Sequence, residues 1–228
     1  MKSSILRLAG VLAFVIVGFA AQAQNSRQYI RENIDEWGQC SNVAITRTNG
    51  DVAIYGSNGW AASQVPSGMT AAFRDLHDRE KTLKDIVLTE DGSWLILWGG
   101  NGYNSEGLTS SLSNKLRQFN DDREELTSVA FNDAGEWAIV GVSHIAASSD
   151  AIQDWLLSGL DDYGTLWSVH MTDDSMIAVY ENGYKFLGDV PESMKDALRN
   201  TDLNVYRAKF AGQSWFFADR NGNYQYNM

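Results

Sequence analysis

The feature that most constrains this chain is an internal repeat. The stretch 83–125 reads as two strands, a hairpin containing Asn-Gly, a third short strand and an amphipathic helix, and versions of it fill the chain. Similarity at a period of roughly 40 residues is the signature of a repeat architecture, in which each unit buries its apolar face against its neighbours. We therefore expect a row of similar units rather than one irregular domain.

Alternating apolar positions indicate the strands. Two copies align at four such positions, namely Ile86, Leu88, Trp94 and Ile96, then Val129, Phe131, Trp137 and Ile139. Alternation of apolar and polar residues is typical of strands with one buried face. A glycine precedes the tryptophan by two residues in both copies, as Gly92 and Gly135.

Asn-Gly pairs are expected to form the hairpins between the second and third strands. They occur as Asn58-Gly59, Asn101-Gly102, Asn182-Gly183 and Asn221-Gly222. Asn-Gly accepts the positive φ angles of a type I′ turn, so the sequence predicts such turns here. The third copy departs from the pattern, with Val142-Ser143-His144 in this place.

Helical spacing recurs once in each unit. Apolar residues three or four apart occur as Ile30, Ile34 and Trp37; Met69, Phe73 and Leu76; Leu112, Leu116 and Phe119; Ile152, Leu156 and Leu160; and Met194 with Leu198. This spacing predicts amphipathic helices. Pro66 and Pro191 suit the first helical position, where the missing N–H would lack a partner. Thr109 and Ser149 are expected to cap two other helices through their hydroxyls.

The two ends of the chain suggest the topology. The first helix, 26–37, has no strand before it, and the last strands have no helix after them. The chain therefore divides into five helix-plus-strand units, at about 25–64, 65–107, 108–148, 149–189 and 190–228. We predict an α+β repeat protein with one domain, 24–228. Each unit has a helix and a short antiparallel β-meander, and the units close into an α/β-propeller-like ring with strands inside. An open solenoid is the alternative.

Residues 1–23 have the features of a secretory signal peptide. Lys2 and Arg7 precede an apolar run, 8–19, and Ala21-Gln22-Ala23 is a small-residue cleavage site. Cleavage after Ala23 would place the protein in the periplasm or outside the cell, with no membrane insertion afterwards. The alternative is an uncleaved N-terminal anchor.

The charge balance restricts the classes of partner that we expect this protein to bind. The chain has 18 basic and 29 acidic residues, a formal net charge of −11, and removal of Lys2 and Arg7 leaves 16 against 29, or −13. An acidic surface repels phosphate backbones, so we expect no nucleic-acid partner. The same charge would favour cations or a basic partner.

The repeat pattern V-x-F-x-x-x-G-x-W-x-I, followed by N-G-Y and a helix, resembles tandem repeats of uncharacterised secreted or surface bacterial proteins. The resemblance covers the chain after the signal peptide and implies a propeller-like fold but no activity. The number of units is also similar to that of tachylectin-like propellers, which bind sugars through all-β blades. Pentein-type α/β-propellers mix strands and helices, but their enzymes need a late cysteine nucleophile, whereas Cys40 is early and the only cysteine.

Metal and catalytic motifs are weak. His77, His144 and His170 lack ligand spacing, and the loop 219–223 lacks the bidentate glutamate of a calcium loop. We therefore expect no metal, no cofactor and no catalytic set from local motifs. Cys40 is expected to be a small buried apolar residue.

Aromatic residues near the hairpins are the candidate ligand-binding set. They are Trp60, Trp98, Tyr103, Tyr184 and Tyr224. Repetition would place flat rings at equivalent positions, where they can stack on a sugar or anchor a peptide. The competing interpretation is that these rings pack across strands and steady the hairpins.

These observations together favour an exported, non-enzymatic binding or interaction module. Its expected ligand is a glycan, a cell-wall fragment or a protein. One alternative is a hydrolase with paired carboxylates, and another is a structural surface protein that self-associates. The oligomeric state does not follow from the sequence.

Overall fold

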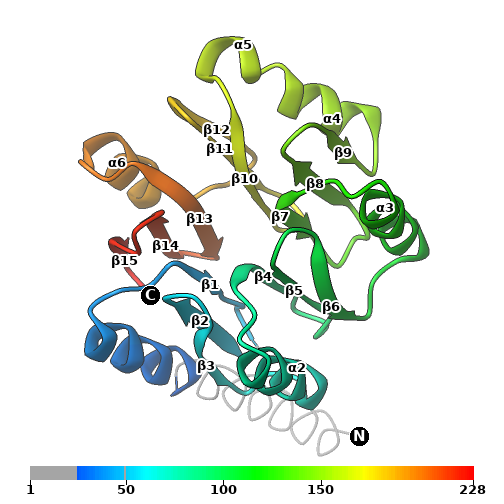
Figure 1. Ribbon diagram of the computed structural model, residues 1–228. Coiled ribbons are helices and arrows are strands. Elements are labelled where there is room, and N and C mark those ends of the chain that lie inside the picture. The colour runs from blue at the N-terminus through cyan, green and yellow to red at the C-terminus, as the bar shows by residue number, and fades with distance from the viewer. Residues whose placement is uncertain (1–24, 49) are drawn as a thin grey trace, which may run out of the picture.

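The computed structural model describes residues 25–48 and 50–228. The predicted signal peptide, 1–23, lies outside the described residues. Figure 1 shows five small sheets arranged about a common axis, with helices on the outside.

Each sheet is antiparallel and has its three strands in sequence order. The sheets are β1 (Asn42–Ala44), β2 (Asp51–Tyr55) and β3 (Gly59–Ser63); β4 (Leu83–Leu88), β5 (Trp94–Trp98) and β6 (Gly102–Glu106); β7 (Leu126–Phe131), β8 (Trp137–Gly141) and β9 (Ile145–Ala147); β10 (Leu166–Met171), β11 (Met176–Tyr180) and β12 (Gly183–Leu187); and β13 (Val205–Ala211), β14 (Ser214–Asp219) and β15 (Tyr224–Tyr226). The helices are residues 25–37, α2 (Ser67–Asp78), α3 (Ser110–Asp121), α4 (Asp150–Leu157), α5 (Leu160–Tyr163) and α6 (Glu192–Asn200).

The predicted repeat is confirmed: there are five units, each with a helix and a three-stranded antiparallel sheet. The sheets themselves do not close into a ring, because no β-ladder joins one sheet to the next in the part of the chain that the structure describes. The predicted ring is therefore not closed by its sheets. Neighbouring units meet through side chains and through single backbone hydrogen bonds, such as the one from the Leu83 N–H to the Ser57 carbonyl at 2.7 Å.

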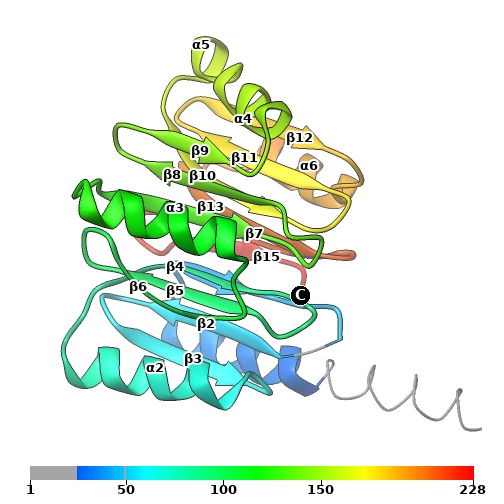
Figure 2. The ribbon, with the colours of Figure 1, turned by 90° about the vertical axis from the view of Figure 1, so that its right-hand side faces the viewer.

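Five separate hydrophobic cores hold the units together, and each core is a helix between two sheets. The helix α3, for example, packs its Leu112, Leu116 and Phe119 between β4–β6 and β7–β9 (Figure 2). Helical spacing places these residues on one face, so a single helix covers apolar surface from both neighbouring sheets. The predicted apolar stripes are confirmed, with Trp37 and Leu160 only partly buried.

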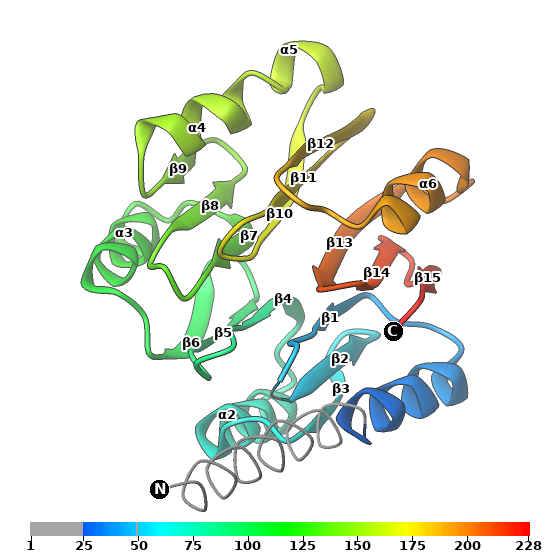
Figure 3. The ribbon, with the colours of Figure 1, turned by 180° about the vertical axis from the view of Figure 1, so that it is seen from behind.

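The fifth core joins the first unit to the last. Ile30 and Ile34 of the N-terminal helix pack against Val43 of β1 and Phe216 of β14. Figure 3 shows this helix beside β15 and the C-terminal end of the chain. The Cys40 N–H donates to the Gly222 carbonyl at 2.9 Å.

The helix starts largely match the predictions. Thr109 and Ser149 cap α3 and α4, and their hydroxyls accept hydrogen bonds from backbone N–H groups three residues on. Pro66 and Pro191 are N-cap residues, one position before the predicted one.

The helix expected to include Leu160 ends early. The Leu156 carbonyl at the end of α4 accepts a hydrogen bond from the Tyr180 hydroxyl at 2.7 Å. The Tyr180 ring lies where a side chain on Gly159 would be. The helix therefore stops at Leu157, and α5 forms a separate turn.

The type I′ turns predicted at Asn-Gly are wrong for three hairpins. Gly59, Gly102 and Gly183 have no positive φ and are instead the first residues of β3, β6 and β12. A Cβ on Gly102 would lie 2.6 Å from the Trp98 ring. These glycines are needed because an aromatic ring packs directly on their backbone.

None of the described helices is long and apolar enough to cross a membrane.

Candidate functional site

The innermost strands β1, β4, β7, β10 and β13 build the site. Alternate residues of a strand share a face, so every second residue of an inner strand can face the axis. A buried polar tier is formed by Asn42, the first residue of β1, and by the third residue of each other inner strand, namely Asp85, Ser128, Ser168 and Arg207. In β4, β7, β10 and β13 a register shift lies between the first and third positions. Such a shift re-aims the side chain that follows it.

Asp85 is the centre of the buried polar tier. Its Oδ1 accepts hydrogen bonds from Asn42 Nδ2 at 2.7 Å and from Lys209 Nζ at 2.9 Å. Its Oδ2 accepts from Ser128 Oγ at 2.7 Å and from the Val129 N–H at 3.1 Å. This one carboxylate therefore ties together the first, second, third and fifth units.

The charges around Asp85 balance the cost of its burial. Burial opposes ionisation of Asp85, but the positive charges of Lys209 and Arg207 outweigh it and lower the pKa of Asp85. Burial lowers the pKa of Lys209, and Asp85 offsets only part of that effect. The side chains of Lys209 and Asp85 are 2% and 0% exposed, so solvent screens this pair little.

Arg207 closes the axis below Asp85. Its Nη2 donates to the carbonyls of Thr127 at 2.6 Å and Lys84 at 3.5 Å, and its Nη1 donates to those of Tyr206 at 3.1 Å and Trp167 at 3.3 Å. Carbonyls from four units thus converge on one guanidinium. Its Nε is the single buried side-chain nitrogen or oxygen without a hydrogen bond among the described residues.

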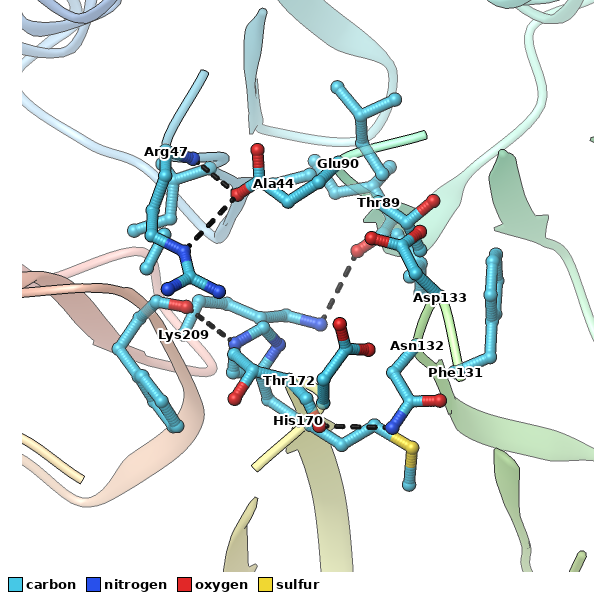
Figure 4. Close-up of a pocket in the computed structure, with 18 residues that line it drawn as sticks. Ala44, Arg47, Thr89, Glu90, Phe131, Asn132, Asp133, His170, Thr172 and Lys209 are labelled. Carbon is cyan, nitrogen blue, oxygen red and sulfur yellow. Dashed lines mark hydrogen bonds and ion pairs between the residues drawn. The ribbon is translucent and has the colours of Figure 1, made fainter. Parts of the chain in front are cut away.

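A pocket opens on the axis at the other end, above Lys209. Its walls are the C-terminal ends of all five inner strands and the residues that follow them, within 44–47, 86–90, 131–133, 170–173 and 209–211. Figure 4 shows these segments surrounding it. The space between the walls is about 530 Å³ including open solvent, but only about 40 Å³ is available to the centres of water-sized molecules.

His170 lies in the wall of this pocket. Its Nε2 is 2.7 Å from the Phe210 carbonyl, which can only accept, so Nε2 carries the hydrogen. Burial, followed by the charge of Lys209, lowers the pKa of His170 to about 3. The ring is therefore neutral at pH 7, and its Nδ1 is a hydrogen-bond acceptor.

Acidic residues surround the pocket mouth and also join neighbouring units. Glu90 accepts hydrogen bonds from the N–H groups of Arg47 and Thr48 in the preceding unit, and from the Thr48 hydroxyl at 2.7 Å. The Arg47 Nε is 3.8 Å from Glu90, and half of the Arg47 side chain is exposed.

The next two units repeat this arrangement. Asp133 accepts from the Asp91 N–H at 3.3 Å, and Asp173 accepts from the Ala134 N–H at 3.1 Å. The fifth unit has Gly212 at the equivalent position and lacks such a carboxylate. The mouth therefore carries three acids, all contributed by the second, third and fourth units.

The predicted aromatic residues lie away from this pocket, among the helices. Trp60 stacks on Phe73 of α2 with ring centroids 5.1 Å apart. Trp98 donates from Nε1 to Asn104 Oδ1 at 2.8 Å, and Arg79 lies 5.6 Å above its ring. Both tryptophans pack against the core between the first and second sheets.

The three predicted tyrosines belong to three other cores. Tyr103 packs in the core around α3, and Tyr184 packs near Phe186 in the core around α6. The Tyr224 hydroxyl donates to the Ile34 carbonyl at 3.4 Å. The structure thus brings only Trp60 and Trp98 to a common core and does not gather the five residues at one surface.

Other predicted candidates are distributed as follows. Cys40 is buried, and burial raises the pKa of its thiol to about 12. His77 interacts with the Asn58 carbonyl at 3.3 Å, and His144 lies 3.1 Å from Glu124. Over residues 25–48 and 50–228, no group of three or more His, Cys, Asp or Glu side chains could hold a metal ion.

The sequence contains a signal for this site that is not a local motif. One polar residue recurs among mainly apolar residues near the start of every inner strand, as Asn42, Asp85, Ser128, Ser168 and Arg207. Buried polar groups require partners, so a polar residue repeated at one core position predicts a common polar network.

No protein-family model and no curated protein sequence matches this chain. A solved structure described as "YCF48 bound to D1 peptide" is similar over 79% of this chain, with 12% sequence identity and a TM-score of 0.26. The match covers 48% of that chain, about half its length. A likeness at this level does not place the protein in a family.

Proposed function

We propose that this chain is an exported, non-enzymatic binding module and that its ligand enters the axial pocket. The observation that supports this most is the pocket wall, to which all five inner strands contribute. Repeat architectures characteristically bind across surfaces that their units build together.

The ionisable groups of the pocket favour binding over proton transfer. Efficient general acids and bases have pKa values near the working pH, whereas the pKa of His170 is about 3. Lys209 and Asp85 form a buried ion pair with each other. The floor is therefore better suited to holding a ligand by fixed hydrogen bonds.

A melting screen of the protein without residues 1–23 tests this proposal. A ligand that binds only the folded state raises the melting temperature as its concentration increases. The panel contains soluble polysaccharides, cell-wall fragments and peptides of either charge. The exposed mouth residue Asp173 is replaced by tryptophan to obstruct the pocket, and Glu181→Trp, on a distant hairpin, is the matched control. If the proposal is correct, Asp173→Trp abolishes the increase in melting temperature caused by the ligand, and Glu181→Trp does not.

The aromatic set, Trp98 and Tyr103 in particular, is the competing location for a glycan. Its test is Trp98→Ala together with Tyr103→Ala in the same screen. Loss of the ligand's shift in this variant, but not in Asp173→Trp, would move the site to the hairpins. The cation over Trp98 favours the pocket, because one face of that ring is already covered.

The carboxylate hydrolase has one observation in its favour. Burial, together with the neighbouring Asp91, raises the pKa of Asp133, whereas the Thr89 hydroxyl lowers that of Asp91. Neighbouring carboxyls with opposite shifts are the pattern used in acid–base hydrolysis. Hydrolysis of chromogenic glycosides that is lost in Asp133→Asn and in Asp91→Asn would establish this alternative.

We also propose that the five units form a closed, propeller-like ring in solution, rather than an open solenoid. The core shared by the first helix, β1 and β14 supports it. Hydrogen exchange at the Cys40 amide, which donates to Gly222, is the test. In a ring this amide is protected as strongly as those linking other units, and in an open solenoid it exchanges quickly.

A further inference from the structure

We propose that the axial pocket receives one cationic head group, an alkylammonium or a guanidinium, carried on a slender chain. This inference rests on the proposed binding function and specifies its ligand chemistry. Four features of the pocket support it: its width, the acceptor in its wall, the charge at its mouth and the position of Arg47.

The width selects a narrow group. About 40 Å³ is available to the centres of water-sized molecules, and roughly 10–15 Å³ of such space holds one water molecule. The inner pocket therefore has room for a group the size of a few water molecules, and a bulky group would not fit. An alkyl chain with a compact head fits this space better than a sugar ring.

The wall offers an acceptor rather than a donor. Since His170 Nε2 donates to Phe210, the neutral ring presents the lone pair of Nδ1. Figure 4 shows the His170 ring in the wall of the pocket, between Lys209 and Thr172. The nearby side chain of Asn132 is already used, because it donates to Glu136 and to the Thr172 carbonyl and accepts from the Glu136 N–H. A ligand that donates hydrogen bonds therefore complements the free acceptor at His170.

The charge at the mouth favours a cation. Glu90, Asp133 and Asp173 line it, against the single positive charge of Arg47. Lys209 adds little positive potential from the floor, because Asp85 forms a buried ion pair with it. Asp173 lies at the mouth, where its Oδ1 accepts a hydrogen bond from the Ala134 N–H at 3.1 Å.

Arg47 is the group that a cationic ligand would displace. Its guanidinium extends into the space above Lys209 and His170 in Figure 4. The contact from its Nε to Glu90 is 3.8 Å, longer than a hydrogen bond, and half of the side chain is exposed. The chain thus holds a loosely attached guanidinium of its own at the place proposed for the ligand's cation.

Calorimetric titration with two matched probes tests the charge requirement. Butylguanidinium and butylurea have nearly the same shape, but only the first is charged. We expect saturable binding of one butylguanidinium per chain, weaker at high salt because exposed charges are screened, and no binding of butylurea. Equal binding of the two probes would overturn the inference.

Two variants should change the affinity for butylguanidinium in opposite directions. Asp173→Asn keeps an oxygen for the Ala134 N–H but removes the charge, and should weaken binding about tenfold, as expected for the loss of a charged hydrogen bond. Arg47→Gln removes the competing cation and should strengthen binding. Asp161→Asn and Arg74→Gln make the same charge changes at exposed positions on α5 and α2 and should have no effect. Unchanged affinity in both pocket variants would contradict the proposal.

Further probes separate the two sources of such a head group. Spermidine represents a free polyamine, and Gly-Arg-Gly, with its citrulline counterpart as neutral control, represents a basic peptide. If no cationic probe binds but another ligand in the melting screen is lost in Asp173→Trp, the binding function stands and this inference fails. If Asp173→Trp affects no ligand at all, both fail.

Discussion

Lys209 Nζ lies 2.9 Å from Asp85 Oδ1, although the two residues are 124 positions apart. The contact joins the inner strand of the fifth unit to that of the second, with both side chains almost completely buried. A hydrogen bond from Lys209 to the Ile86 carbonyl, at 3.3 Å, adds to it. The ion pair therefore links units that are not neighbours in the sequence.

Removing one partner of this pair should be costly. Lys209→Met leaves the Asp85 carboxylate buried without its ammonium, and breaking a buried pair in this way costs about 3–5 kcal/mol. The double variant Lys209→Met with Asp85→Asn should recover part of that loss, because no uncompensated charge remains. Urea unfolding of the two single variants and the double variant measures the coupling. Additive losses would contradict a direct interaction.

The contributions of Asp85 and Asp51 to stability should change in opposite directions with pH. The pKa of Asp85 is lowered in the folded state, so its ionised form contributes stability above the unfolded pKa of about 3.9. That contribution is lost as the pH falls below about 4, through the folded pKa. Burial raises the pKa of Asp51 despite Arg27 nearby, so the folded state binds this proton more tightly, and stability decreases as the pH rises above about 3.9.

Stability measured between pH 3 and 6 in Asp85→Asn and Asp51→Asn checks these signs. Asp85→Asn should reduce the acid-induced loss of stability, whereas Asp51→Asn should increase the net slope of stability with pH. The same change of slope in both variants would show that one assignment is wrong.

Arg207 should be needed for the lower end of the axis. Arg207→Met removes the guanidinium that donates to the carbonyls of Thr127, Trp167 and Lys84. The Tyr206 carbonyl also loses this donor but keeps a hydrogen bond from the Ser168 hydroxyl at 2.9 Å. Buried groups left without a hydrogen bond cost about 1–3 kcal/mol each, reduced where water can enter. We expect a loss of about 3 kcal/mol or more in urea unfolding. Arg207→Lys should rescue this only in part, because an ammonium cannot reproduce the planar fork of a guanidinium.

Gly102 should be intolerant of a side chain for a packing reason. A Cβ there would lie 2.6 Å from the Trp98 ring, while Gly100 in the same hairpin has open space around its Cβ position. Gly102→Ala should cost about 1–3 kcal/mol through displacement of the ring. Gly100→Ala should change stability by less than about 0.5 kcal/mol. Equal effects of the two substitutions in urea unfolding would contradict the packing explanation.

Much of the local structure was predictable from the sequence, because it depends on neighbours along the chain. The 3.6-residue spacing of Leu112, Leu116 and Phe119 determined a helix and its buried face, and the Thr109 hydroxyl determined how that helix begins. Period-two alternation likewise predicted the strands. The repeat itself established five units, each with a helix and three strands.

The Asn-Gly hairpins show the limit of such local reasoning. Asn-Gly favours positive φ in isolation, but at Gly102 the packing of Trp98 on the backbone decides the conformation. Tertiary packing also distributes the aromatic residues that were predicted as a binding set. They pack in four separate cores, each built around a different helix.

The sequence by itself determined the units, their helices and strands, and the polar residue repeated inside each inner strand. Only the tertiary structure decided what those polar residues do. Asp85, Lys209 and Arg207 belong to different units, and their charges become stable in the interior only when folding brings them within hydrogen-bonding distance. The axial pocket depends in the same way on five strand ends that no local pattern places together.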